Sequence, residues 1–125
     1  MGDKPVLRHA AAREALDAMG YAATSAYLAD MCALVLRETG LLPHVNAGLM
    51  TEQEILRLRQ VSVSQGIMLE TASKRLSERG GAHFGSPDKD PQLRLAMIDA
   101  AGRARVPFTS GILIGIGETR AERLQ

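Results

Sequence analysis

Aromatic residues are scarce in this sequence. They make up 3% of the 125 residues, tryptophan is absent, and no basic cluster is interleaved with them. Basic and acidic side chains number 15 and 14, which leaves a formal charge of +1. Proteins that bind nucleic acid rely on clustered Lys and Arg and on aromatic side chains that stack with bases. We therefore expect no nucleic-acid partner.

The sequence also has little cysteine and no long apolar run. A single cysteine, Cys32, excludes an internal disulfide and any multi-cysteine metal site within this chain. The three histidines, at positions 9, 44 and 83, are too scattered to indicate zinc, so no metal ligand is predicted. No apolar run approaches the roughly 18 residues of a membrane span, and the first residues lack the pattern of a signal peptide. A cytoplasmic protein without membrane contact is expected.

The segment 107–119, PFTSGILIGIGET, is the most distinctive part of the chain. Its alternation predicts a strand with one bulky and one nearly bare face; the bare face carries Thr109, Gly111, Leu113 and Gly115. Glycine inside a strand costs about 0.5–1 kcal/mol relative to alanine. Either close packing or a flat ligand against Leu113 would explain the two glycines. A helix capped by Thr119 is predicted to follow.

Helices and strands alternate along the rest of the chain. The predicted strands cover 42–46, 62–69 and 108–114, and the predicted helices cover 10–19, 24–39, 51–59, 71–79 and 91–105, the second of them capped by Thr24. Strands joined by helix-length connections are expected to be parallel. Bulky side chains gather on one face of the strands, which favours a barrel with outer helices over an open doubly wound sheet. A whole barrel takes about 250 residues. The sequence thus predicts one partial α/β barrel domain, residues 1–125, incomplete at both ends.

Polar residues at the carboxyl ends of barrel strands commonly line the active site. That rule selects His44, Asn46, Glu70 and Glu118. The eleven-residue loop GGAHFGSPDKD adds His83, Ser86, Asp88 and Lys89, which either clamp a polar substrate or belong to a solvated connection. No spacing indicates a Ser-His-Asp arrangement or an HExxH zinc site. The residues alone leave the chemistry open.

Several motifs together resemble one family. GDKP, ETGLLPHVN, VSVSQGIMLET, HFGSPDKDP and PFTSGILIGIGET are similar, in this order, to the 7,8-didemethyl-8-hydroxy-5-deazariboflavin synthase family. These are radical S-adenosylmethionine (SAM) enzymes of coenzyme F-420 biosynthesis, found alone or as the first half of a fused FO synthase. The resemblance implies a lyase with a (β/α) barrel, SAM and a four-iron four-sulfur cluster. A 5'-deoxyadenosyl radical abstracts hydrogen from an adduct of tyrosine and 5-amino-6-ribitylaminouracil, and ring closure releases ammonia.

The resemblance also implies site residues. Contacts with SAM are expected from Gly2, Asp3, Lys4, Pro5, Glu70, Ser73, Gly111, Leu113, Gly115 and Glu118. Contacts with the small-molecule substrate are expected from His44, Asn46, His83, Ser86, Asp88 and Lys89. The second half of FO synthase, fused or separate, is an expected partner.

One departure from the family pattern concerns the cluster. The family binds it through a CxxxCxxC loop, which this chain lacks, and Cys32 lies in helical sequence that matches none of the three cysteines. The cluster ligands are therefore expected outside this chain, and this fragment alone is expected to be inactive. Another radical SAM synthase, of the biotin-synthase type, is an alternative, although the HFGSPDK loop favours the deazariboflavin family. A non-catalytic module that binds an adenosine-containing ligand is a further alternative.

Overall fold

Three short parallel strands form the centre of the computed structural model, which describes residues 4–125. They are β1 (His44–Val45), β2 (Ser64–Gly66) and β3 (Phe108–Thr109), and their spatial order is β1-β2-β3. Val45 lies opposite Gln65, and Gln65 lies opposite Phe108. An isolated parallel bridge between Glu70 and Ile112 continues the pairing. The predicted parallel arrangement is confirmed, although each strand is shorter than expected.

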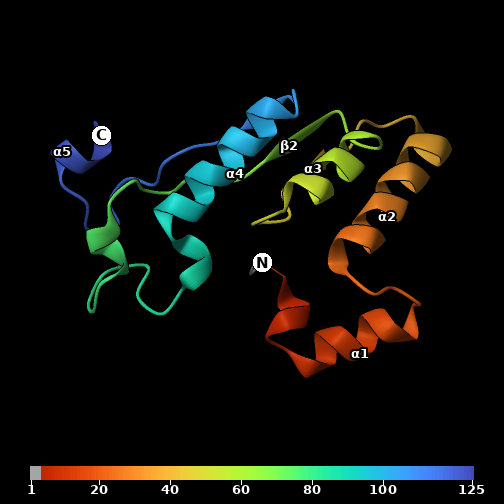
Figure 1. Cartoon of the computed structure of the whole chain (residues 1–125), viewed down its shortest axis with the longest axis horizontal. Helices are drawn as coiled ribbons and strands as arrows, with labels where there is room; N and C mark the ends of the chain where they lie inside the picture. Colours follow the sequence, from red (N-terminus) through yellow and green to blue (C-terminus); the bar gives the residue numbers. More distant parts are fainter. Residues whose placement is uncertain (1–3) are drawn as a thin grey trace.

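Helices of different lengths connect and flank the strands. They are the 3-10 helices η1 (Pro5–Leu7), η2 (Lys74–Ser77) and η3 (Pro87–Lys89), and the α-helices α1 (Ala10–Ala18), α2 (Thr24–Thr39), α3 (Glu52–Arg59), α4 (Pro91–Arg103) and α5 (Arg120–Arg123). In Figure 1, α1 and α2 lie at the opposite end of the molecule from α5, with α3 and α4 between them. Among residues 4–125, every helix is too short or too polar to span a lipid bilayer.

Local capping residues determine where several helices begin. The Thr51 hydroxyl accepts from the backbone N–H of Glu54, whose carboxylate accepts from the N–H of Thr51 at 2.8 Å. Thr119 and Glu122 form the same reciprocal pair at α5. These capping boxes confirm the predicted starts of both helices. At α2, by contrast, Ala23 is the N-cap, so Thr24 is the first helical residue and does not cap the helix as predicted.

The predicted helix 71–79 is wrong. Only Lys74–Ser77 is helical, as a short 3-10 turn. Glu70, directly before this segment, has a positive φ of 66°, which turns the backbone away from a helical path. The carbonyl of Leu76 accepts from the N–H of His83 at 2.9 Å, a bond to the following loop that replaces an intrahelical one.

The core lies on the helix-covered face of the sheet. Val45 and Ile67 are buried there, together with Ile55 and Leu58 of α3 and Met97 of α4. α3 packs against both α2 and α4, which places the three helices on one side. Burying each of these large side chains contributes about 1.5–3 kcal/mol. The predicted bulky, helix-covered face is therefore present in the first part of the sheet.

The opposite face of the sheet is open. His44, Asn46 and Thr109 are exposed on it. Farther along the third predicted strand, Ile112 and Ile114 are 44% and 69% exposed, so helices among the described residues do not cover them as expected. Within residues 4–125 the sheet stays open at β1 and β3, and these residues alone form no closed barrel.

Candidate functional site

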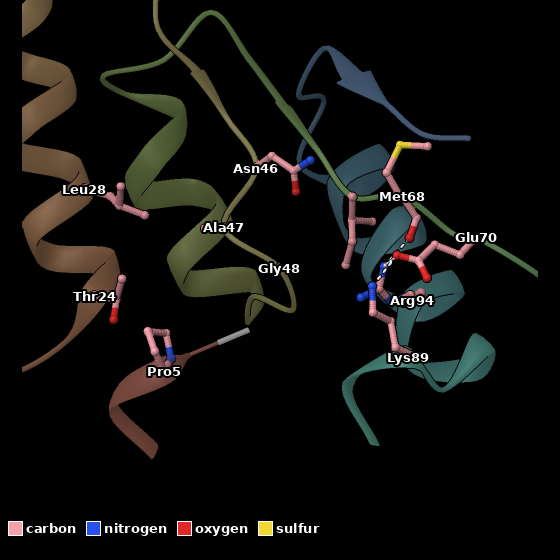
Figure 2. A pocket seen from close by; sticks show the side chains of 11 residues that line it. Pro5, Thr24, Leu28, Asn46, Ala47, Gly48, Met68, Glu70, Lys89 and Arg94 are labelled. Atoms are coloured by element: carbon pink, nitrogen blue, oxygen red, sulfur yellow. Dashed lines mark hydrogen bonds and ion pairs between the residues drawn. The ribbon is translucent and has the colours of Figure 1, made fainter. Parts of the chain in front are cut away.

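A cavity of about 330 Å³ lies where the chain leaves β1 and β2. Asn46 and Gly48 follow the end of β1, whereas Met68 and Glu70 follow the end of β2. Figure 2 shows Glu70, Lys89 and Arg94 grouped on one side, with Thr24 and Pro5 on the other. The remaining lining residues are Leu28, Ala47 and Ile67. The cavity thus has three charged groups at one end and an apolar wall.

The Glu70 carboxylate is buried and held by three basic side chains. Its Oε2 lies 2.8 Å from Nε2 of His83, and its Oε1 accepts from Nζ of Lys89. Nη1 of Arg94 lies 3.6 Å from the same Oε1. Arg94, itself 2% exposed, also donates to the backbone carbonyls of Asp88 and Met68. Removing one member of such a buried charged group typically costs about 3–5 kcal/mol.

The backbone of Glu70 is fixed as firmly as its side chain. Its N–H donates to the carbonyl of Gly111 at 2.9 Å, and its carbonyl accepts from the N–H of Leu113 at 2.8 Å. The positive φ of 66° costs a non-glycine residue about 1–2 kcal/mol. This strained conformation directs the carboxylate toward the loop 80–90, and it links the cavity to the glycine-rich segment.

Asp88 attaches that loop to the N-terminal part of the chain. Its Oδ1 accepts from Nη2 of Arg8 at 2.8 Å. Burial opposes ionisation of Asp88, but the hydrogen bond from Arg8, a backbone donor and the charges of Arg8 and Lys89 outweigh it and hold the pKa of this carboxyl below its ordinary value. Asp88 is therefore engaged within the protein, and Lys89 is the loop residue that reaches the cavity.

Other predicted substrate contacts lie elsewhere. His83 and Ser86 line a different cavity. His44 lies on the open face of the sheet, where its Nδ1 is 2.8 Å from Oγ of Ser64. Of the six residues in this set, the first cavity brings together Asn46 and Lys89.

The predicted SAM contacts are similarly divided. Gly2 and Asp3 lie outside the described residues. Pro5 and Glu70 line the first cavity, whereas Nζ of Lys4 lies 3.0 Å from Oε2 of Glu54. The Ser73 hydroxyl donates to Oε1 of Glu122 at 2.5 Å.

The glycine-rich segment differs from the predicted bare strand face. Gly115 lies in a turn with a φ of 86°, so its glycine is explained by backbone conformation, and a Cβ there would meet no atom within 4 Å. A Cβ on Gly111 would lie 2.7 Å from Cε of Met68, which gives this glycine a packing partner. Leu113 is 40% exposed. None of the three lines the first cavity.

Glu118 stabilises the turn that contains Gly115. Its carboxylate accepts from the backbone N–H groups of Gly115, at 3.0 Å, and of Ile116, at 2.8 Å. These backbone donors, with the charge of Arg123, lower the pKa of Glu118. The carboxylate is thus occupied by its own loop.

Two of the polar or charged side chains that line the cavity were not predicted from the sequence as site residues. Arg94 shares its helical stripe with Met97 and Ala101, and a charged residue at a core position of a helix is a signal that sequence reasoning could have used. Thr24 was predicted only as a helix cap. Thr24 lines the cavity, and its buried Oγ1 finds no hydrogen-bond partner among residues 4–125.

The polar residues of the first cavity suit a small ligand that carries both a positive and a negative group. Lys89 and Arg94 can bind a carboxylate, Glu70 can bind an ammonium or a hydroxyl group, and Thr24 and Asn46 add polar contacts. They do not suit an iron–sulfur cluster. Cys32 is buried in α2, burial raises the pKa of its thiol, and residues 4–125 contain no group of three His, Cys, Asp or Glu arranged to hold a metal.

Comparison with known proteins gives the chain its relatives. FO synthase from Streptomyces coelicolor is 56% identical over 126 aligned positions, which cover 100% of this chain. The chain is related over its full length to FO synthase. FO synthase from Mycobacterium tuberculosis is 52% identical over 98% of the chain, and the 7,8-didemethyl-8-hydroxy-5-deazariboflavin synthase from Methanopyrus kandleri is 45% identical over 99%. The predicted family resemblance is confirmed.

The chain spans only part of these relatives. It covers 14% of the Streptomyces and Mycobacterium FO synthases and 37% of the Methanopyrus protein. No family model matches the chain, and no solved structure matches it.

Proposed function

We propose that this chain is the central part of a radical SAM barrel in an enzyme that forms the deazaflavin FO from a tyrosine and 5-amino-6-ribitylaminouracil adduct, with release of ammonia. The observation that carries this proposal is the full-length similarity to proteins named FO synthase in bacteria and 7,8-didemethyl-8-hydroxy-5-deazariboflavin synthase in an archaeon. The enzyme would be cytoplasmic and work with the second half of FO synthase. The cluster ligands would come from residues outside this chain.

The first cavity is the proposed site for the amino-acid end of SAM. Lys89 and Arg94 would bind its carboxylate, and Glu70 would accept hydrogen bonds from its ammonium group or ribose hydroxyls. Thr24 lines the same cavity, and its buried Oγ1 has no partner among residues 4–125. Bound SAM would supply radical chemistry to the substrate. Because Glu70 is already held by His83 and Lys89, its carboxylate would need little reorganisation on binding.

The open face of the sheet is the proposed surface for the second substrate. His44 is exposed there, and its contact with Ser64 fixes the orientation of the ring. The glycine-rich segment 111–115 lies beside Glu70 through backbone hydrogen bonds, which supports the proposal that the adenine of SAM lies over Leu113.

A segment swap tests this proposal. The matched segment of Streptomyces coelicolor FO synthase is replaced with this chain, and FO is quantified against an authentic standard after anaerobic reconstitution. The swapped FO synthase should produce FO, and the same protein carrying Glu70→Gln should produce at least tenfold less. The unswapped enzyme is the control for cluster content and folding. A swapped protein with a full cluster and a cooperative melt that makes no FO would rule out the proposed function.

A further inference from the structure

An ion pair joins two segments that lie on opposite sides of the first cavity. Nη2 of Arg8 donates to Oδ1 of Asp88 at 2.8 Å, across 80 residues of sequence. Arg8 directly follows η1, whose first residue, Pro5, lines the cavity. Asp88 directly precedes Lys89, which lines the cavity from the other side (Figure 2). The pair therefore connects two walls of the cavity, although neither of its members lines the cavity itself.

A short hydrogen-bonded turn holds Pro5 and Arg8 together. The backbone N–H groups of Arg8 and His9 both donate to the carbonyl of Pro5, at 3.0 and 2.9 Å. On the other side of Pro5, Nζ of Lys4 lies 3.0 Å from Oε2 of Glu54, which belongs to α3. The ring of Pro5 fixes its own φ, so this turn has little freedom of its own. The position of this wall is therefore set by the place where Arg8 is held.

Asp88 is in turn connected to both cationic groups of the cavity. Its backbone carbonyl accepts from Nε of Arg94 at 2.9 Å. Lys89 is the next residue of the same 3-10 helix, η3, and its Nζ donates to the Glu70 carboxylate. A displacement of Asp88 would move the carbonyl that binds Arg94 and the backbone that carries Lys89. Arg8 thus acts on the cavity through Asp88.

The burial of the two partners differs, and this determines which of them would move. The side chain of Arg8 is 43% exposed, whereas that of Asp88 is 9% exposed. Without the pair, the guanidinium would return to water, but the carboxylate would stay buried and lack its partner, which is the costlier state. The charge of Lys89 also acts on this carboxylate. A displaced Asp88 would therefore compete for Lys89 with Glu70 and with any bound carboxylate.

We propose that Arg8 is a positioning residue for the first cavity: by holding Asp88, it keeps Lys89 directed at the carboxylate of the bound ligand. This inference rests on the proposed function, because that function assigns the amino-acid end of SAM to this cavity. The ion pair then matters for ligands that carry this carboxylate. An adenosyl ligand without an amino-acid end gains nothing from it.

Three adenosyl ligands separate this role from a structural one. Equilibrium dialysis with the swapped, anaerobically reconstituted FO synthase measures the affinities for SAM, S-adenosylhomocysteine and 5'-methylthioadenosine, which has no amino-acid end. Arg8→Gln should weaken binding of the first two about fivefold, the effect of one lost hydrogen bond, and leave the third unchanged. Arg8→Lys keeps the charge and can still make a single contact with Asp88, so its SAM affinity should stay within about twofold of the parent's.

Arg13→Gln is the matched control. Arg13 carries the same charge on the same segment, but its Nη2 donates to the carbonyl of Val6 and not to the loop 80–90. All three affinities should therefore equal those of the parent.

A second substitution tests the route through Lys89. Lys89→Gln removes the cation that Arg8 is proposed to position, so adding Arg8→Gln should cause no further loss of SAM affinity. Losses that multiply would overturn the inference. Unchanged SAM affinity in Arg8→Gln would overturn it too, as would an equal loss for SAM and 5'-methylthioadenosine, which would give the ion pair a structural role only. If Arg8→Gln lacks the cluster content or melting temperature of the parent, Asp88→Asn removes the charge of the pair from the other side, and the same outcomes apply.

The two proposals fail in different ways. A swapped parent that binds SAM but makes no FO would contradict the proposed function, and the affinities would still decide the role of Arg8. A swapped parent that makes FO, with an Arg8→Gln variant that keeps full SAM affinity, would contradict the role of Arg8 alone. A parent that binds no SAM would overturn both.

Discussion

The N–H of Glu70 donates to the carbonyl of Gly111 at 2.9 Å, and the carbonyl of Glu70 accepts from the N–H of Leu113 at 2.8 Å. This pair joins the charged end of the first cavity to the glycine-rich segment. A change at Glu70 therefore affects both a buried charge network and a backbone ladder. The two effects can be separated by choosing substitutions that alter one at a time.

Glu70→Gln keeps the volume of the side chain and removes its charge. We expect a loss of roughly 3 kcal/mol in the free energy of unfolding, because the buried Arg94 and the partly buried Lys89 lose their counter-charge. Glu70→Gly removes the same charge but relieves the positive φ, so it should be about 1 kcal/mol more stable than Glu70→Ala. Urea denaturation of the three variants measures both differences. Equal stabilities for the glycine and alanine variants would show that the positive φ at Glu70 costs no free energy.

In the swapped FO synthase, Glu70→Gln should also weaken SAM binding more than binding of the second substrate. The reason is that Glu70 lines the cavity proposed for the amino-acid end of SAM. Equilibrium dialysis with each ligand measures the two affinities. Unchanged SAM affinity with reduced affinity for the second substrate would assign the first cavity to that substrate and not to SAM.

Glu122 should make stability depend on pH. The hydrogen bonds from Arg75 first, and from Ser73 next, lower the pKa of Glu122 well below its ordinary value of 4.5. A carboxyl whose pKa is lower in the folded state stabilises the fold at pH values above the unfolded pKa and loses this contribution as the pH falls. The difference in melting temperature between the parent chain and Glu122→Gln should thus be full at pH 7 and shrink below about pH 4.5. A difference that stayed constant down to pH 3 would exclude this origin.

Iron binding tests the expectation drawn from the cysteine content. One buried cysteine, Cys32, cannot replace the three thiolates of the family loop. Anaerobic reconstitution of this chain with iron and sulfide should yield far fewer than four irons per chain, and Cys32→Ala should give the same value. Incorporation of about four irons with a matching visible spectrum would refute the argument.

Local signals predicted much of the fold. The capping boxes at Thr51 and Thr119 lie within four residues of sequence, and both are present in the structure. Parallel pairing followed from the lengths of the connections. The segment 71–79 is not the predicted helix because distant contacts that no local pattern encodes hold it: Ser73 binds Glu122 across 49 residues of sequence, and Glu70 forms a bridge with Ile112, which comes after α4.

The strand-end rule selected part of the cavity. Asn46 and Glu70 follow β1 and β2, and the structure brings them to one cavity with Pro5 and Lys89. Arg94 was not selected, because the rule considers residues that follow strands and Arg94 lies inside α4. The expected bare strand face also failed at Gly115, since alternation assumes an extended backbone and this residue has a φ of 86°.

The two glycines of that segment should respond differently to alanine. Gly115→Ala should cost about 1 kcal/mol through its positive φ, although the space around it is open. Gly111→Ala should cost less, because Cε of Met68 is the far end of a flexible side chain and can move away. If adenine lies over Leu113, Gly111→Ala should also remove most of the SAM-induced rise in melting temperature of the swapped FO synthase. Retention of the whole rise would leave packing against Met68 as the reason for this glycine.

Thr24 provides the sharpest separation of stability from ligand binding. The residue lines the first cavity, and its buried Oγ1 has no partner among residues 4–125, so in the free protein the hydroxyl is a cost of about 1 kcal/mol or more. Thr24→Val has nearly the same shape and removes that cost, so the free energy of unfolding should rise by about 1 kcal/mol, as urea denaturation would measure.

If the hydroxyl of Thr24 serves a ligand in the cavity, SAM affinity of the swapped FO synthase should fall about fivefold with the same substitution. Ser25→Ala, one position along α2, is the control for SAM affinity alone, because its side chain hydrogen-bonds Glu54 and does not line the cavity. A valine variant that gained stability and kept full SAM affinity would place the amino-acid end of SAM elsewhere. A valine variant that lost stability would show that the hydroxyl is satisfied within the protein.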